Sequence, residues 1–171
     1  MKGKWAAGIE PRNFAWLIKD RLAMSERPGG HARTHRRVRR QEEIIWIREQ
    51  GFSRVVSLLP SPHNLRAYDE LGVAWEHLPL ATATDPQPLL EELYARLYQW
   101  LGAGEKVIVH HEELGDRLQG VMAGFLVYAA LVPSAAQAIS VVERINQRQM
   151  GPAGRELVAV AERIARDRQP G

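Results

Sequence analysis

The stretch that decides the fold is Val107-Ile108-Val109-His110-His111-Glu112-Glu113-Leu114-Gly115-Asp116-Arg117. Its three β-branched apolar residues predict a short buried strand, and the polar residues and glycine that follow predict a loop. Residues 118–131 are apolar enough to form a buried helix. A strand that runs through a tight loop into a helix is a common way to build an anion site, because the loop N–H groups and the helix N-terminus converge on one point.

The sequence on either side of this stretch alternates between strand and helix patterns. Further strands are expected over residues 13–18, 21–25, 54–59 and 73–78. Helices are expected over residues 38–50, with Gly51 as the C-cap, and over 64–71 and 88–101. Two more helices are expected, one with Ser134 as its N-cap and one around Val160. The alternation predicts an α/β fold with three layers, in which a central, mostly parallel sheet of four or five strands carries helices on both faces.

The stretch 107–117 resembles the phosphate-binding loop of the cysteine-dependent protein phosphatases. Their pattern is Val-x-Val-His-Cys, five variable residues and Arg. Here the two valines and the first histidine match, and Arg117 falls at the spacing of the arginine. The position of the nucleophilic cysteine holds His111. The resemblance implies that the frame of the loop is kept while the chemistry of its nucleophile is lost.

Other segments resemble the small, atypical dual-specificity phosphatases in order and spacing, namely residues 13–28, 51–58, 77–86 and 138–148. The third of these resembles the segment that normally carries the general-acid aspartate, but no carboxylate lies between Leu80 and Thr82, and Asp85 is displaced by several residues. The resemblance covers nearly the whole chain. It implies one phosphatase-like domain over residues 1–171, with residues 1–12 as a loose N-terminal arm.

The resemblance assigns the degenerate catalytic positions to His111, Arg117 and Asp85. The expected anion site is the Arg117 guanidinium with the loop backbone of Glu113, Leu114, Gly115 and Asp116. The loop has acquired three carboxylates against this one arginine, and like charges about 4 Å apart repel by roughly 4 kcal/mol at an effective dielectric constant near 20. Leu114 stands where the family has a glycine, which favours close backbone approach.

Three roles remain open for His111. It fills the former cysteine pocket, it acts as a nucleophile that forms a phosphohistidine, or it ligates a metal together with His110, Glu112 or His77. Adjacent residues of a strand point to opposite faces, and no His-x-x-x-His spacing is present, so neither a metal site nor a cofactor is expected. Arg117 has two open roles, which are contact with an anion and an internal ion pair with an acid of the loop.

The chain contains no cysteine. This excludes disulfides, thiolate metal sites and a thiol nucleophile. Hydrophobic residues make up 45% and charged residues 25%, which is typical of a globular protein. No run of about 18 apolar residues predicts a membrane span, and no apolar segment near residue 1 predicts a signal peptide, so a cytoplasmic location is expected.

The positive charge is concentrated in one short segment. Its arginines form a surface basic patch, namely Arg33, Arg36, Arg37, Arg39 and Arg40. Such a patch binds nucleic acid, phosphoinositide or an acidic protein, or it is a solvated helix face.

Together these features predict a catalytically inactive, phosphatase-like protein, a pseudophosphatase with a binding or regulatory role. Its expected partners are a phosphorylated or acidic protein and an anion such as phosphate or sulfate at the loop. One alternative is an active phosphate-ester hydrolase that uses His111 as nucleophile and Arg117 to bind phosphate. A further alternative is a basic-surface protein that binds nucleic acid or phosphoinositides.

Overall fold

The structure, a computed structural model, describes residues 7–30, 37–82 and 84–168. The chain forms two compact units, one of Met1–Pro79 with Trp100–Glu113 and one of Leu80–Gln99 with Leu114–Gly171. The single domain expected over residues 1–171 stays a prediction. Within the described residues, no helix combines the length and apolar character that crossing a membrane requires.

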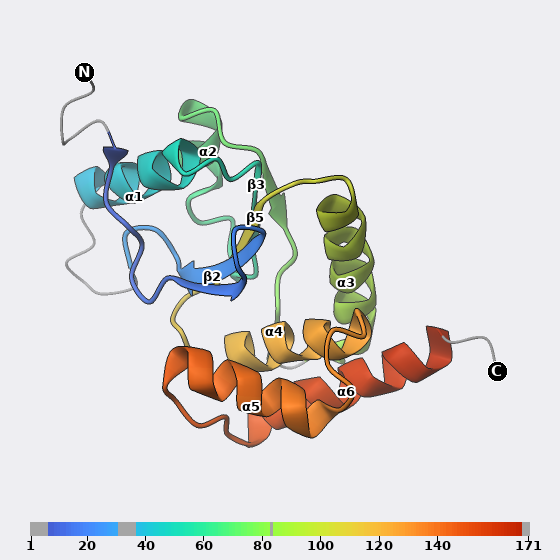
Figure 1. The fold of residues 1–171 in the computed structure, drawn as a ribbon. Coiled ribbons are helices and arrows are strands. Elements are labelled where there is room, and N and C mark those ends of the chain that lie inside the picture. The colour runs from blue at the N-terminus through green and yellow to red at the C-terminus, as the bar shows by residue number, and fades with distance from the viewer. Residues whose placement is uncertain (1–6, 31–36, 83, 169–171) are drawn as a thin grey trace. The chain divides into compact units, whose positions relative to one another are not determined.

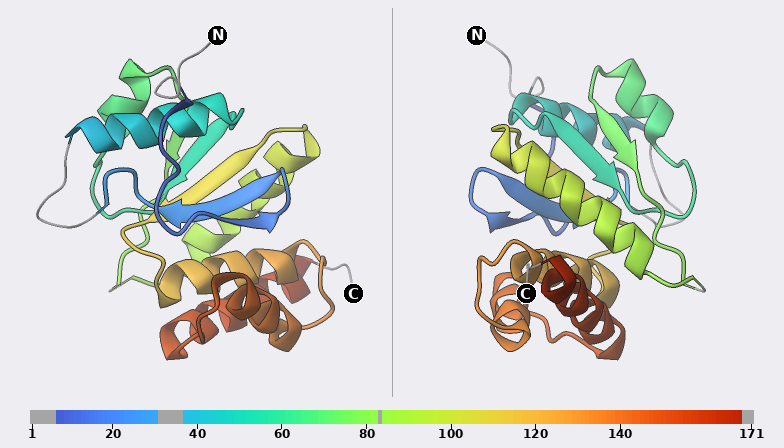
Figure 2. Two further views of the ribbon diagram at one scale, coloured as in Figure 1. Left: turned by 60° about the vertical axis from the view of Figure 1, so that its left-hand side comes forward. Right: turned by 90° about the vertical axis from the view of Figure 1, so that its right-hand side faces the viewer.

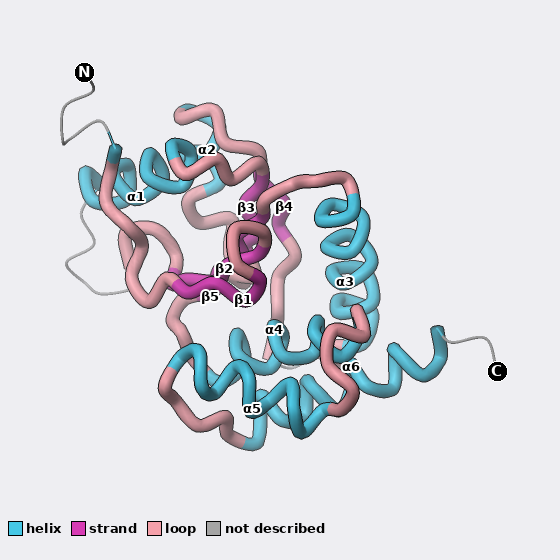
Figure 3. The backbone as a smooth tube through the Cα atoms, viewed as in Figure 1, coloured by secondary structure: helices cyan, strands magenta, loops and turns pink. Residues whose placement is uncertain are grey.

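The first unit contains a five-stranded sheet in the order β1-β2-β5-β3-β4 (Figures 1 and 3). β1 and β2 pair antiparallel, and the other three pairs are parallel. The expected α/β fold with a mostly parallel sheet is therefore confirmed. The strands are β1 (Ala15–Ile18), β2 (Leu22–Glu26), β3 (Arg54–Ser57), β4 (Trp75–His77) and β5 (Val107–His111).

The strand from the fold-deciding stretch, β5, lies at the centre of the sheet between β2 and β3. Its first four residues are buried, as a run of β-branched residues in a parallel sheet predicts. Its carboxyl end lies beside the carboxyl ends of two parallel neighbours, because His111 is opposite Glu26 and His110 is opposite Ser57. In open α/β sheets this is the edge at which ligands bind.

The helices are α1 (Arg37–Glu49), α2 (Leu65–Glu70), α3 (Gln87–Gly102), α4 (Asp116–Tyr128), α5 (Ala135–Asn146) and α6 (Pro152–Arg168). In the first unit, α1 and α2 pack on one face of the sheet, where Ile44, Ile47 and Tyr68 join Val55 and Ile108 in a single core (Figure 2). Each of these five side chains is fully buried, and together they fix the position of both helices against β5.

Two helices begin or end at the residues expected to cap them. After α1, Gly51 has a φ of 86° and its N–H donates to the Arg48 carbonyl, so it closes the helix in the left-handed conformation that glycine favours. Before α5, the Ser134 hydroxyl accepts a hydrogen bond from the Gln137 N–H at 3.2 Å. Both caps were predicted from the sequence and are confirmed.

The arm expected over residues 1–12 lies outside the described residues as far as residue 6. Its described part is anchored on α1, because the Ile9 N–H donates to the Glu42 carbonyl at 3.0 Å. A Cβ atom at Gly8 would lie 2.5 Å from the Trp46 backbone nitrogen, so this part of the arm touches the helix backbone directly.

The second unit is built around α4, whose residues from Leu118 to Leu126 are all buried. It packs against α5 and, more extensively, against α6 (Figure 2). Glycine permits the second contact: a Cβ atom at Gly120 would lie 2.5 Å from the Gly154 carbonyl oxygen. The two helix backbones therefore touch at this pair of glycines.

Several element boundaries differ from the sequence-based expectation by one to three residues, and two of the differences have a clear cause. β4 has three residues instead of six, because the Val73 N–H donates to the Tyr68 carbonyl at 2.9 Å and belongs to the turn that closes α2. α4 begins at Asp116, two residues earlier than expected, because the Gln119 N–H already donates to the Gly115 carbonyl. The loop between β5 and α4 is correspondingly shorter.

Candidate functional site

His110 lies near the end of β5 and is fully buried. Its Nε2 atom and the Tyr68 hydroxyl are 2.7 Å apart and share a hydrogen bond. Burial, followed by the nearby His111, Arg27 and His77, lowers the pKa of His110 to about 3. The ring is therefore neutral at physiological pH. This geometry is that of a hydrogen-bonded core residue.

His111, at the position of the family's cysteine, is the last residue of β5 and is half-buried. Its carbonyl accepts a hydrogen bond from the Arg27 N–H at 2.8 Å, so the strand pairing with β2 continues to this residue. The two loop residues that follow it, Glu112 and Glu113, are exposed. The backbone at His111 is thus fixed by the sheet rather than by the loop.

His77 was a candidate to ligate a metal together with His111, but its ring forms a hydrogen bond with the backbone. Its Nε2 atom lies 2.7 Å from the Leu59 carbonyl oxygen, to which it donates a hydrogen bond. Among the residues that the structure describes, no three histidine or carboxylate side chains come together as metal ligands. The geometry at the end of β5 therefore offers no support for metal chemistry.

Leu114 and Gly115 open the second unit. The Leu114 side chain is buried, and its carbonyl accepts a hydrogen bond from Arg148 Nη1 at 2.6 Å. Leu114 does not adopt the left-handed conformation that would favour glycine. Gly115 is the N-cap of α4 and has an extended backbone, with φ −104° and ψ −174°. No glycine-specific backbone conformation is needed at either position.

The Asp116 carboxylate is directed at the N-terminus of α6. Its Oδ2 atom accepts a hydrogen bond from the Gly154 N–H at 2.7 Å, and its Oδ1 atom accepts one from the Gly151 N–H. A helix N-terminus carries unsatisfied N–H groups and a partial positive charge, both of which a carboxylate compensates. In the sequence, Asp116 is one of the three loop acids that oppose Arg117; in the structure its carboxylate caps α6.

Arg117 lies in the first turn of α4, is half-buried and lines a pocket of about 130 Å³. Within its own unit, it makes no hydrogen bond or ion pair with any described residue. The pocket is also lined by the segment expected to carry the general acid and by α6: Leu80, Ala81, Thr82, Thr84, Pro86, Ala153, Glu156 and Leu157. Arg117 and the segment after Leu80 therefore line the same pocket.

The carboxylate that lines this pocket is not the one expected from the sequence. Asp85 is exposed and does not line it; its Oδ1 atom accepts a hydrogen bond from the Gln87 N–H at 3.0 Å and so begins α3. Glu156, on the exposed side of α6, does line it. Sequence reasoning missed Glu156, because nothing in its spacing connects it with Arg117.

The surface basic patch is only partly visible, because Arg33 and Arg36 lie outside the described residues. Arg39 forms an ion pair of 2.7 Å with Glu43, whose side chain is 1% exposed. Arg40 donates to the Asn64 side chain at 3.4 Å, and Arg37 is exposed at the start of α1. One of the three described arginines of the patch is therefore neutralised within the helix.

Comparison with solved structures places this geometry in a known fold. Kinase-associated phosphatase, with its catalytic-site cysteine replaced by serine, superposes with a TM-score of 0.72 at 21% identity, over 86% of this chain and 92% of that one. Tk-PTP in its active form gives 0.69 at 23% identity, over 87% and 96%. A mouse putative dual-specificity phosphatase complexed with zinc tungstate gives 0.67 at 18% identity, over 92% and 89%.

The chain has a dual-specificity phosphatase-like fold. No protein-family model and no curated protein matches its sequence. At these identities the likeness establishes the fold alone, so the role of each site residue has to be argued from this chain's own geometry.

Proposed function

We propose that this chain is a pseudophosphatase that binds an anion at Arg117 and does not cleave phosphate esters. The observation that carries the proposal is the absence of any cysteine from a chain with a phosphatase-like fold. Cysteine-dependent phosphatases attack phosphorus with a thiolate. The position for this group holds His111, which ends a strand and whose backbone is held by Arg27.

The second requirement of the reaction is an acid that protonates the leaving oxygen, an effect worth about 10²–10⁴ in rate. The segment that lines the Arg117 pocket contributes Leu80, Ala81 and Thr82 and no carboxylate at these positions. The nearby Asp85 is bonded to the backbone at the start of α3. Nucleophile and acid are thus both replaced, while the arginine is retained.

Anion binding is supported by the surroundings of Arg117. The Arg117 guanidinium has no internal partner among the described residues of its unit. It can therefore bind a phosphate in bidentate fashion. The lining also contains Thr82 and Thr84, whose hydroxyl groups are hydrogen-bond donors. A pocket of about 130 Å³ suits one tetrahedral anion and not a drug-sized ligand, which occupies roughly 300 Å³ or more. A phosphate group on a protein, or an acidic side chain, fits this chemistry.

Phosphate binding tests the role of Arg117. In titration calorimetry with inorganic phosphate, Arg117→Ala is expected to weaken binding by about tenfold or more, because a hydrogen bond to a charged group contributes about 1.5–3 kcal/mol. Glu156→Gln is expected to strengthen binding, because it removes a negative charge from the same pocket.

The matched control is Arg163→Ala, which removes an equal charge from an exposed position of α6 outside the lining. It should leave the affinity within about twofold. Equal affinities for the wild-type protein and Arg117→Ala would show that Arg117 does not hold the anion.

A further inference from the structure

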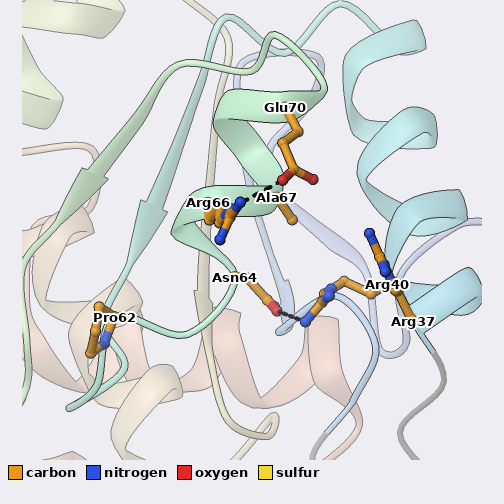
Figure 4. A pocket seen from close by; sticks show the side chains of 7 residues that line it. All are labelled: Arg37, Arg40, Pro62, Asn64, Arg66, Ala67 and Glu70. Carbon is orange, nitrogen blue, oxygen red and sulfur yellow. Dashed lines mark hydrogen bonds and ion pairs between the residues drawn. The ribbon is translucent and has the colours of Figure 1, made fainter.

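A second pocket, of about 470 Å³, lies between α1 and α2 in the first unit (Figure 4). Its walls are Arg37 and Arg40 of α1, Arg66 and Glu70 of α2, and Pro62 and Asn64 of the loop before α2. In Figure 4, the Arg40 side chain of α1 reaches to Asn64 before α2, and the Arg66 side chain lies against Glu70. The pocket brings a residue of α2, which the sequence analysis did not single out, beside part of the surface basic patch.

The lining carries excess positive charge. It holds three arginines and one glutamate, and the glutamate is already used, because Arg66 Nε lies 3.2 Å from Glu70 Oε1. The Arg66 side chain is 92% exposed, so this ion pair is weak and readily exchanged for another anion. Arg37 makes no hydrogen bond or ion pair with a described residue. The lining therefore carries about two positive charges that no acidic residue of the lining compensates.

Arg40 is the part of the wall that is held in place. Its Nη1 atom donates to Asn64 Oδ1 at 3.4 Å, and its Nε atom is buried with no acceptor among the described residues. Asn64 is itself fixed, because it is 6% exposed and its Nδ2 atom donates to the Pro28 carbonyl at 2.8 Å. A buried donor without an acceptor costs about 1–3 kcal/mol, more when it is charged, and an anion in the pocket would supply the acceptor.

We propose that this pocket binds the phosphate groups of a small, multiply charged phosphate compound. A guanidinium group binds phosphate oxygens in bidentate fashion. Three guanidinium groups can therefore contact the phosphate oxygens of one compound from more than one side. The volume is within the range of small-molecule sites. The described lining contains no aromatic residue, which disfavours stacking of nucleic-acid bases.

The site is separate from the Arg117 pocket, because all its lining residues belong to the other unit. It therefore goes beyond the proposed function and does not depend on it. The same chemistry is carried by a free phosphate compound and by the head group of a phosphoinositide, and the experiment has an arm for each source.

Titration calorimetry with pyrophosphate tests the proposal. The double substitution Arg37→Ala/Arg66→Ala is expected to weaken binding by about tenfold or more, since it removes two charged donors at exposed positions where the fold is not at risk. Arg40→Gln should weaken it similarly. Arg163→Ala should leave this affinity within about twofold, since it removes an equal charge from a residue that does not line the pocket.

The second arm measures retention on vesicles that contain phosphatidylinositol bisphosphate. Retention that the double substitution abolishes assigns the site to a lipid head group, and pyrophosphate binding without retention assigns it to a free phosphate compound. The proposal is overturned if the double substitution leaves pyrophosphate affinity unchanged, or if Arg163→Ala reduces it as much.

Discussion

Gly120→Ala is expected to lower the free energy of unfolding by about 2–3 kcal/mol, the upper part of the range for overpacking a close contact. The new Cβ atom would lie 2.5 Å from the carbonyl oxygen and 2.6 Å from the Cα atom of Gly154. Both are backbone atoms, so neither can rotate away, and α4 and α6 must separate. Unfolding in guanidinium chloride, followed by far-ultraviolet circular dichroism, measures the change.

The control for this substitution is Gly102→Ala at the end of α3. Its Cβ atom would meet nothing within 4 Å. Alanine is favoured over glycine in a helix by about 1 kcal/mol, so this variant should be as stable as the wild-type protein or slightly more stable. A Gly120→Ala protein as stable as Gly102→Ala would contradict the backbone contact between α4 and α6.

Asp116→Ala is expected to lower the free energy of unfolding by about 2–3 kcal/mol, because it removes two charge-assisted hydrogen bonds and the negative charge at the N-terminus of α6. The N–H groups of Gly151 and Gly154 lose their acceptor. Asp116→Asn keeps one acceptor oxygen and should lose about half as much. The same denaturation experiment gives both values.

Glu113→Ala is the control for Asp116. It removes a carboxylate from the same loop, but the Glu113 side chain is exposed, and such surface substitutions usually change stability by less than about 0.5 kcal/mol. If Asp116→Ala were as harmless as Glu113→Ala, Asp116 would not be the cap of α6 and its charge would again count against an anion near Arg117.

Local sequence patterns predicted the main strands and helices of the fold. The run Val107 to Val109 predicted the central strand, and Gly51 and Ser134 predicted helix ends, because each signal depends on neighbours within a few residues. The boundary of β4 was missed because Val73 is bonded to Tyr68 of the preceding helix. A strand propensity cannot reveal a bond of this kind.

The candidate site was only partly predictable, because its decisive contacts join residues that are far apart in the sequence. Asp116 meets Gly154 across 38 residues, and Tyr68 meets His110 across 42. The approach of Glu156 to the Arg117 pocket has no local signature either. Spacing could place Arg117 in a loop frame, but only the packing of α6 on α4 determines which acids lie near it.

The most direct test of the central claim is the hydrolysis of p-nitrophenyl phosphate by the purified wild-type protein at acidic and neutral pH, compared with His111→Ala. We expect that neither protein exceeds the rate of buffer alone, since the chain has no thiol and the segment from Leu80 to Thr82 has no acid. Turnover by the wild-type protein that disappears in His111→Ala would contradict it and identify His111 as a nucleophile.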